Sequence, residues 1–430
     1  MPSHRRAARE PSRSTEMKTA WAGRDDVLDS EEYALFCAGQ LADPYPLLAW
    51  LRSNDPVHWS PTLDTWILTR YDDVLAGLLD KRFANDRISA NMAALPPELQ
   101  KSCAPLGEHV SNWLGFTDPP KHTRLRGLLR TTFSASLGEE LAPRIGEIVD
   151  DLLESIAQDS RADLIVSFAF QLPARVICEI LGVPGEHTKA FHRWSDDMAA
   201  FTGNLGPTLV EIAPRAMRSY VELEEFMGAM VAESNRCPAG DLMNHLAQAE
   251  AGGQLSRPEL IGLSVFTLVA GHETTASLLA NALSILLEDH ALRTELERNP
   301  QLFPNAVEEF LRLEAPIQFS PRLCAEDLES RGQEIRRGDV VMLHLGAANR
   351  DPERFPEPDR IDLERENNRH LSFAWGPHFC LGAPLARAEA IVALPRFFER
   401  FPHARLTGEP LSWRQNMTMR SVEHLSVDLG

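Results

Sequence analysis

The 430-residue chain lacks any run of eighteen or more uninterrupted apolar residues, so we expect no membrane-spanning helix. It is also short of positive charge: 43 lysines and arginines face 62 acidic residues, and the formal net charge is −19. Phosphate binding needs a basic surface, so a nucleic-acid role is excluded. A secretory signal is missing, and the six cysteines are scattered without paired spacing. We therefore expect a protein of the reducing cytoplasm.

Two cofactor signatures are also missing. The chain has no G-x-G-x-x-G pattern after a strand for a dinucleotide, and no clustered cysteines for an iron–sulfur centre. Any electrons for redox chemistry must then come from partner proteins. What is present is ordinary for a globular protein, with 43% hydrophobic and 24% charged residues. Residues 1–25 are polar and basic, and we expect them to form a disordered tail.

The stretch around Cys380 stands out, because Gly376 and Gly382 bracket the cysteine and Pro377 stiffens the turn before it. A helix is predicted from Pro384 onward, so the sulfur lies in a loop just before a helix N-terminus. Backbone N–H groups and the helix dipole at such a place favour a thiolate. A buried structural cysteine is the alternative. Zinc is disfavoured because no second ligand stands at C-x-x-C spacing.

The same stretch fills the pattern F-x-x-G-x-H-x-C-x-G with Phe373, Gly376, His378, Cys380 and Gly382. This pattern strongly resembles the haem-ligand loop of the cytochrome P450 superfamily, in which a cysteine thiolate is the proximal ligand of the iron. The resemblance implies that Cys380 binds the metal and that Phe373, His378 and Gly382 bind the cofactor. Many bacterial members have glycine where this chain has Ala374, and we expect the extra methyl group to cost little.

A long helix is predicted from Ser256 to about Leu287, and its N-terminal half is apolar almost all round. In its middle, glycine and an acid interrupt the apolar run, and both weaken a buried helix. Such a local conflict suggests a functional site. The interrupting residues match the family's A-G-x-[D/E]-T oxygen-binding motif, and they are Ala270, Gly271, His272, Glu273 and Thr274.

In that resemblance Ala270 and Gly271 lie against the haem, and Gly271 makes room over the iron. Thr274 offers its hydroxyl to bound dioxygen, and Glu273 passes protons inward. Neighbours on a helix project about 100° apart, so Glu273 and Thr274 cannot both face the iron. We therefore expect Thr274 to face the oxygen and Glu273 to face a water path or a cationic partner.

Basic residues elsewhere are candidates for the haem propionates. The sequence D-P-P-K-H-T-R-L-R predicts a helix that carries His122 and Arg126 on one face. A solvated basic face is the ordinary interpretation, but D-P-P-x-H-x-x-x-R resembles the family segment that binds propionates. Arg322, in a strand predicted over 317–322, and His378 occupy further positions of this kind. Two buried carboxylates require charged donors.

Three more residues match a structural feature of the family. Glu309 and Arg312 form an E-x-x-R pair, which is common on helix surfaces. A later P-D-x-x-D-x-x-R pattern ends at Arg365, and we interpret the three residues as a clamp behind the haem loop. The resemblance also implies a substrate pocket, formed by Trp113, Phe201, Phe266, Val269, Ala270, Ile317, Phe319 and Thr418.

Local patterns predict the remaining segments. A helix capped by Asp43 is expected over 43–54, followed by strands at 56–60 and 65–70. Weak periodicity and scattered prolines predict a long loop over 83–117. Glycines and a proline within 191–214 predict a mobile helix-loop-helix lid, and 332–345 are predicted to form a hairpin.

Together these motifs identify the chain as a member of the superfamily over nearly its whole length. The fold class implied is mainly α with a small β-rich side, a single haem-thiolate domain over 26–430. The resemblance implies a soluble bacterial monooxygenase that uses haem b and dioxygen on a hydrophobic small molecule of the secondary-metabolite or xenobiotic type. Oxidative coupling without oxygen insertion is an alternative. A non-catalytic haem sensor or carrier is a more remote one.

Redox partners follow from the same resemblance. Electrons are expected from NAD(P)H through a ferredoxin reductase and a ferredoxin. An acidic ferredoxin needs a basic docking surface, and several arginines lie in segments that the family places on the proximal side of the haem. These residues are Arg124, Arg130, Arg350, Arg369 and Arg387.

Overall fold

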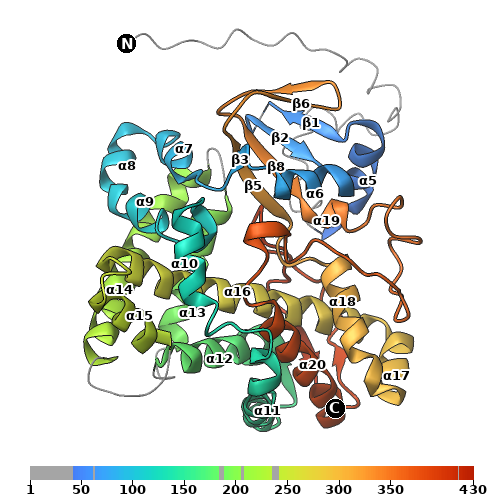
Figure 1. Ribbon diagram of the computed structural model, residues 1–430. Coiled ribbons are helices and arrows are strands. Elements are labelled where there is room, and N and C mark those ends of the chain that lie inside the picture. The colour runs from blue at the N-terminus through green and yellow to red at the C-terminus, as the bar shows by residue number, and fades with distance from the viewer. Residues whose placement is uncertain (1–41, 62, 184–187, 205–207, 235–241, 415) are drawn as a thin grey trace, which may run out of the picture.

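A computed structural model of the protein describes residues 42–61, 63–183, 188–204, 208–234, 242–414 and 416–430 (Figure 1). The tail predicted over 1–25 lies outside these ranges. Within them, no helix is long and apolar enough to cross a membrane. The fold is mainly helical with a small β-rich side, which confirms the predicted fold class.

Helices make up most of the described chain, and Figure 1 shows most of them gathered beside and below the sheet. Short 3-10 turns lie at Leu114–Phe116, Pro300–Leu302 and Gly376–His378, and a π-turn lies at Ile165–Ala169. The α-helices are α5 (Tyr45–Asn54), α6 (Tyr71–Leu79), α7 (Ile88–Ala93), α8 (Pro97–Ser102), α9 (Ala104–Val110), α10 (Lys121–Leu129), α11 (Leu137–Ile156), α12 (Gln171–Leu181), α13 (Thr188–Gly203), α14 (Leu209–Ser234), α15 (Leu242–Ala251), α16 (Arg257–Glu288), α17 (His290–Arg298), α18 (Phe303–Leu313), α19 (Leu345–Ala348) and α20 (Ala383–Arg400).

The main sheet has five strands in the order β1-β2-β8-β5-β3, and only β2 and β8 run parallel. A three-stranded sheet, β4-β10-β9, and a separate β6-β7 hairpin complete the β structure. The strands are β1 (Val57–Ser60), β2 (Thr65–Leu68), β3 (Phe83–Ala84), β4 (Arg161–Asp163), β5 (Phe319–Cys324), β6 (Leu328–Ser330), β7 (Gln333–Ile335), β8 (Val340–His344), β9 (Arg405–Leu406) and β10 (Ser426–Asp428).

Helix α16 is the predicted long helix, and it runs through the middle of the helical part (Figure 1). Its start is fixed by a capping box: the Ser256 hydroxyl accepts from the Glu259 N–H, and the Glu259 carboxylate accepts from the Ser256 N–H. The helix packs against α12, α13, α14 and α20. An apolar helix surrounded in this way is the expected centre of the core.

Two local predictions are wrong. Residues 83–117 form β3 and three short helices rather than a loop, and the prolines sit in the first turns of α8 and α9, where a missing N–H costs nothing. The hairpin spans 328–335 instead of 332–345. Its turn residues Arg331 and Gly332 both have positive φ, and β8 joins the main sheet between β2 and β5.

Smaller differences concern segment ends. The Asp43 side chain accepts from the Tyr45 N–H at 3.3 Å, but Pro44 is the N-cap of α5. The strand predicted over 317–322 is observed as Phe319–Cys324. Strands β1 and β2 confirm the two strands predicted near the N-terminus.

The ion-pair cluster at Glu309 holds α18 against the segment that leads to Cys380. Arg312 is fully buried and donates to both Glu309 oxygens, at 2.7 and 2.9 Å. Arg365 donates to the same carboxylate at 3.0 Å. Arg312 also donates to the carbonyl oxygens of Asn349, Pro358 and Arg360. Breaking such a buried pair costs about 3–5 kcal/mol, so this contact fixes the path of residues 349–365.

Candidate active site

A cavity of about 270 Å³ lies between the Cys380 loop, α10, α16 and the start of β5. Most of its lining is apolar, including Leu114, Leu278 and Leu345. The tertiary structure thus brings together motifs that lie up to 260 residues apart in the chain. The predicted site residues that line it are His122, Arg126, Phe266, Ala270, Gly271, Thr274, Ile317, Phe373, His378, Cys380 and Gly382.

Backbone contacts hold Cys380 at the cavity wall. Its N–H donates to the Phe373 carbonyl at 2.9 Å, after the turn at Gly376–His378, and α20 begins three residues later. The Cys380 side chain is exposed to the cavity, but its position inside the protein raises the pKa of the thiol by desolvation, while the Gly382 and Ala383 N–H groups and Arg126 oppose this increase. The groups expected to favour a thiolate are present, but desolvation outweighs them. A coordinated metal cation is the additional group that would deprotonate this sulfur.

Ala374 adopts a left-handed backbone conformation, with φ of 56°. An L-residue pays roughly 1–2 kcal/mol for this conformation, whereas glycine does not. The expectation that the extra methyl group costs little is therefore wrong. The loop keeps this strained residue directly after Phe373, and the Ala374 N–H donates to the Leu371 carbonyl at 2.8 Å.

One end of the cavity gathers basic side chains. The His122 and His378 rings stack at 3.9 Å, and the buried His122 Nε2 has no partner among the described residues. Arg126 lines the cavity, and one of its Nη atoms donates to the Phe379 carbonyl. Arg322 does not itself line the cavity: it is 4% exposed and donates to the Pro321 carbonyl and to the hydroxyl of Ser320, which lines the cavity.

The charges at this end fit two carboxylates. Burial lowers the pKa of Arg322 to about 10, and the Asp118 charge opposes this shift only in part. A buried guanidinium without a counter-ion is costly unless an anion binds there. The two guanidiniums of Arg126 and Arg322, together with the unpartnered His122 nitrogen, therefore suit the two propionates of a haem.

Two residues at this end were missed in the sequence. Asn85 connects the Asp118 carboxylate, at 3.1 Å, with His378 Nε2, at 2.9 Å. Arg87 is 6% exposed, lies 4.4 Å above the Phe116 ring and donates to the Thr202 carbonyl. Burial lowers the pKa of Arg87 to about 9. Both residues fall in the segment predicted as a loop, where no periodicity pointed to buried positions.

The motif residues of α16 lie on two different faces of the helix. Thr274 lines the cavity, and its hydroxyl donates to the Ala270 carbonyl at 2.8 Å. Glu273 does not line the cavity, as expected from the 100° separation. Gly271 lines the cavity, but a Cβ there would lie 2.8 Å from the Ile177 side chain. Its missing side chain thus allows α12 to pack closely, a role that the sequence did not indicate.

The cationic partner of Glu273 is Arg414. The Glu273 side chain is 2% exposed, and its Oε2 accepts from Arg414 Nη1 at 2.9 Å. The other Nη of Arg414 donates to Asp196 of α13. Burial and the Asp196 charge raise the pKa of Glu273 to about 8, although Arg414 opposes the shift.

Several predicted pocket residues lie elsewhere. Trp113 stands behind Phe266, with ring centroids 5.8 Å apart, and Phe201 is fully buried. Val269 is buried and does not line the cavity. The Thr418 hydroxyl donates to the Gly203 carbonyl and so joins the C-terminal turn to the end of α13. Of the eight residues, only Phe266, Ala270 and Ile317 line this cavity.

The predicted lid is partly outside the described residues, because Gly206 and Pro207 fall in a range that the structure does not describe. Within α13, Phe191 is fully buried and packs against Trp194 and Phe226. These contacts are core packing.

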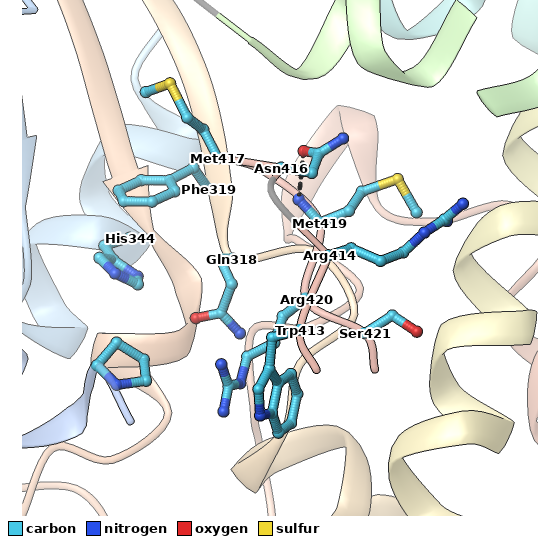
Figure 2. Close-up of a pocket in the computed structure, with 11 residues that line it drawn as sticks. Gln318, Phe319, His344, Trp413, Arg414, Asn416, Met417, Met419, Arg420 and Ser421 are labelled. Atoms are coloured by element: carbon cyan, nitrogen blue, oxygen red, sulfur yellow. Dashed lines mark hydrogen bonds between the residues drawn. The ribbon is translucent and has the colours of Figure 1, made fainter. Parts of the chain in front are cut away.

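Phe319 borders a second, much smaller cavity of about 30 Å³, large enough for about two water molecules (Figure 2). Its ring lies 4.0 Å from the His344 ring. In Figure 2 the Arg414 side chain points away from Phe319 and His344. This cavity is too small for an organic substrate.

Comparisons with known proteins agree with this geometry. The family model described as "Cytochrome P450" matches residues 107–424. The chain is 40% identical to cytochrome P450 107B1 of Saccharopolyspora erythraea, over 86% of this chain and 90% of that one. It is also 40% identical to mycinamicin IV hydroxylase/epoxidase of Micromonospora griseorubida, over 85% and 89% of the two chains. The structure of CxnD, a cytochrome P450 for C–S bond formation in chuangxinmycin biosynthesis, superposes with a TM-score of 0.82 at 32% identity, covering 90% and 95%.

Haem retention tests the basic end of the cavity. Arg322→Ala should weaken haem binding by about 2–5 kcal/mol, because a buried carboxylate loses its charged partner. His122→Ala should cost about 1.5–3 kcal/mol, the usual range for a hydrogen bond to a charged group. Haem transfer to apomyoglobin measures the loss. His290→Ala, at an exposed position at the start of α17, is the control. Wild-type retention in both site variants would contradict the assignment.

Proposed function

Because the chain belongs to the cytochrome P450 family and is therefore a haem-thiolate oxidoreductase, we propose that it inserts one oxygen atom from dioxygen into a hydrophobic small molecule. The supporting observation is that the Cys380 sulfur and the Thr274 hydroxyl line one largely apolar cavity. The two named relatives from secondary metabolism support a substrate of the secondary-metabolite type, with a xenobiotic-type substrate as the other choice.

We assign haem binding to the residues of the cavity already described. Cys380 would bind the haem iron, and His122, Arg126 and Arg322 would hold the propionates, with His378 positioned by Asn85. The haem, when bound, supplies the reductive activation of dioxygen. The largely apolar wall formed by Leu114, Phe266, Ile317 and other residues would exclude water and bind the hydrophobic substrate.

Thr274 has a specific role in this proposal. Its hydrogen is committed to the Ala270 carbonyl, so its oxygen is free to accept a hydrogen bond from an O–H group in the cavity. A hydrogen bond from threonine to the carbonyl one turn earlier also occurs in helices without any function. The position of Thr274 in the cavity wall supports the functional role.

Two other outcomes use the same residues. Oxidative coupling without oxygen insertion stays a candidate, because CxnD forms a C–S bond on a similar fold. A non-catalytic sensor or carrier would need no acid beside Thr274, so the buried Glu273 supports an enzyme. Product mass after reaction with NADPH and surrogate partners separates the outcomes: a gain of oxygen supports insertion, whereas a loss of two hydrogens supports coupling.

The thiolate ligand has a spectroscopic test. We expect the reduced wild-type protein with carbon monoxide to show the strongly red-shifted Soret band of a thiolate-ligated haem. Cys380→Ser should lose this band, because the substitution replaces the sulfur ligand on which the band depends by an oxygen. The matched control is Cys324→Ser, whose thiol donates to the Glu326 carbonyl at 2.8 Å, a bond that a hydroxyl can replace. A wild-type spectrum typical of histidine ligation would reject the assignment.

Proton handling by Thr274 is tested through coupling. Thr274→Ala should retain haem, substrate binding and oxygen consumption, but divert electrons to hydrogen peroxide, since the oxygen atom that accepts a hydrogen bond is gone. The measurement is product formed per NADPH consumed. Thr294→Ala is the control, because its hydroxyl makes the same bond one turn back, to the His290 carbonyl at 2.8 Å, on an exposed helix. Coupling equal to wild type in Thr274→Ala would disprove this role.

We also propose that electrons arrive from NAD(P)H through a ferredoxin and its reductase in the cytoplasm. The described cysteines are all free, which supports a reducing compartment. Of the predicted docking arginines, Arg350 is excluded: it is buried and pairs with Glu314 and Asp359. Arg124 is paired with Glu259, and Arg387 with Glu308.

Arg130 and Arg369 are exposed, and neither has an ion pair among the described residues, so they are the strongest docking candidates. Arg130→Glu and Arg369→Glu should slow the first electron transfer from an acidic ferredoxin, and should reduce its dependence on salt. Stopped-flow reduction measures both effects. Arg298→Glu, exposed at the end of α17, is the control. Reduction that is insensitive to salt and to both charge reversals would count against this docking surface.

A further inference from the structure

The groups around Glu273 form a cluster that reaches the protein surface. It consists of His192 and Asp196 of α13, Glu273 of α16, and Arg414 of the C-terminal segment. Arg414 donates to one oxygen of each carboxylate, namely Glu273 Oε2 and Asp196 Oδ1. The remaining Glu273 oxygen is buried and has no hydrogen-bond partner in the described chain.

Polar atoms of three of these residues converge. A ring nitrogen of His192 and one oxygen each of Asp196 and Glu273 lie within 4.8 Å of one another. His192 Nδ1 is 3.7 Å from Asp196 Oδ2. A single guanidinium neutralises only one of the two carboxylates, so the second negative charge is best compensated by a proton held between them.

Exposure rises along the cluster from the inside to the outside. The Glu273 side chain is 2% exposed, Asp196 is 33% exposed and His192 is 41% exposed. The other neighbour of Glu273 is His272, whose Nδ1 lies 3.9 Å away, but it is fully buried and packs edge-on against Phe170. Solvent protons therefore reach Glu273 most directly through the α13 side.

We propose that Asp196 and His192 are the proton donors that reload Glu273 from solvent, with Arg414 as the positioning residue. This inference rests on the proposed function, because oxygen insertion is what consumes the protons. Each time the Glu273 carboxyl releases a proton toward the Thr274 side of α16, Asp196 transfers one to the Glu273 carboxylate. His192 then returns one to Asp196 and takes up a proton from water. One proton enters for each that leaves, so the cluster keeps its charge.

The sequence offers a matched pair of variants on α13. Asp196→Asn keeps the size of the side chain and an oxygen that can accept from Arg414, but it removes the proton carrier. Asp197→Asn is the control, because the neighbouring Asp197 pairs instead with Ser219 and Arg215. Asp196→Glu restores a carboxyl group and should recover most of the loss.

Two measurements apply to these variants. Product per NADPH should fall several-fold in Asp196→Asn, with a larger solvent isotope effect, and stay at the wild-type value in Asp197→Asn. Infrared titration of the substrate-free protein follows the carboxyl band that Glu273→Gln removes. Because the Asp196 charge contributes to the raised pKa of Glu273, near 8 in the wild type, the midpoint should move to lower pH in Asp196→Asn.

Each outcome is decisive. Wild-type coupling in Asp196→Asn, or an equal loss in Asp197→Asn, would overturn the proposal. If Asp196→Asn does not fold, His192→Gln takes its place at the most exposed position of the cluster, and unchanged coupling and isotope effect there would also overturn it. Failure of the proposed function looks different: the wild-type product would gain no oxygen, while the infrared titration of Glu273 would still report the link to Asp196.

Discussion

Helix α16 must carry one carboxylate through the apolar centre of the protein, and much of the surrounding arrangement follows from this constraint. Glu273 is nearly inaccessible to water, and an isolated buried carboxylate is expensive. The C-terminal segment supplies Arg414, and α13 supplies Asp196, so three segments far apart in the chain meet at one acid. The same contact places a titratable group next to Thr274, which lines the cavity.

At the basic end of the cavity the buried charges are positive rather than negative. There Arg126 and Arg322 are partly or fully buried, with no carboxylate of the described chain bound to them. Glu273 thus has a cationic partner, whereas Arg126 and Arg322 have no bound carboxylate of the described chain at the positions where propionates are expected. A dianionic cofactor would supply the missing carboxylates, and most of the remaining cavity wall is apolar.

Elements that depend on local chemistry were predictable. The start of the long helix at Ser256, the proline at the start of α20 and strand β2 all have short-range causes, and the structure confirms them. Elements of six or seven residues between 88 and 110 were not, because they are too short for a hydrophobic period to emerge. The position of the β6-β7 hairpin was predicted wrongly, because the hairpin depends on a turn in which Arg331 and Gly332 both have positive φ.

Residue types at short, fixed spacings were enough to predict the Cys380 loop, the acid and threonine of α16, and the Glu309–Arg312 pair. The distant side chains that meet these motifs could be identified only from the folded chain. Arg414 and Asp196 lie 141 and 77 residues from Glu273, and Asn85 lies 293 residues from His378. The left-handed backbone at Ala374 and the close approach of Ile177 to Gly271 likewise depend on the path of the folded backbone. No local sequence pattern encodes that path.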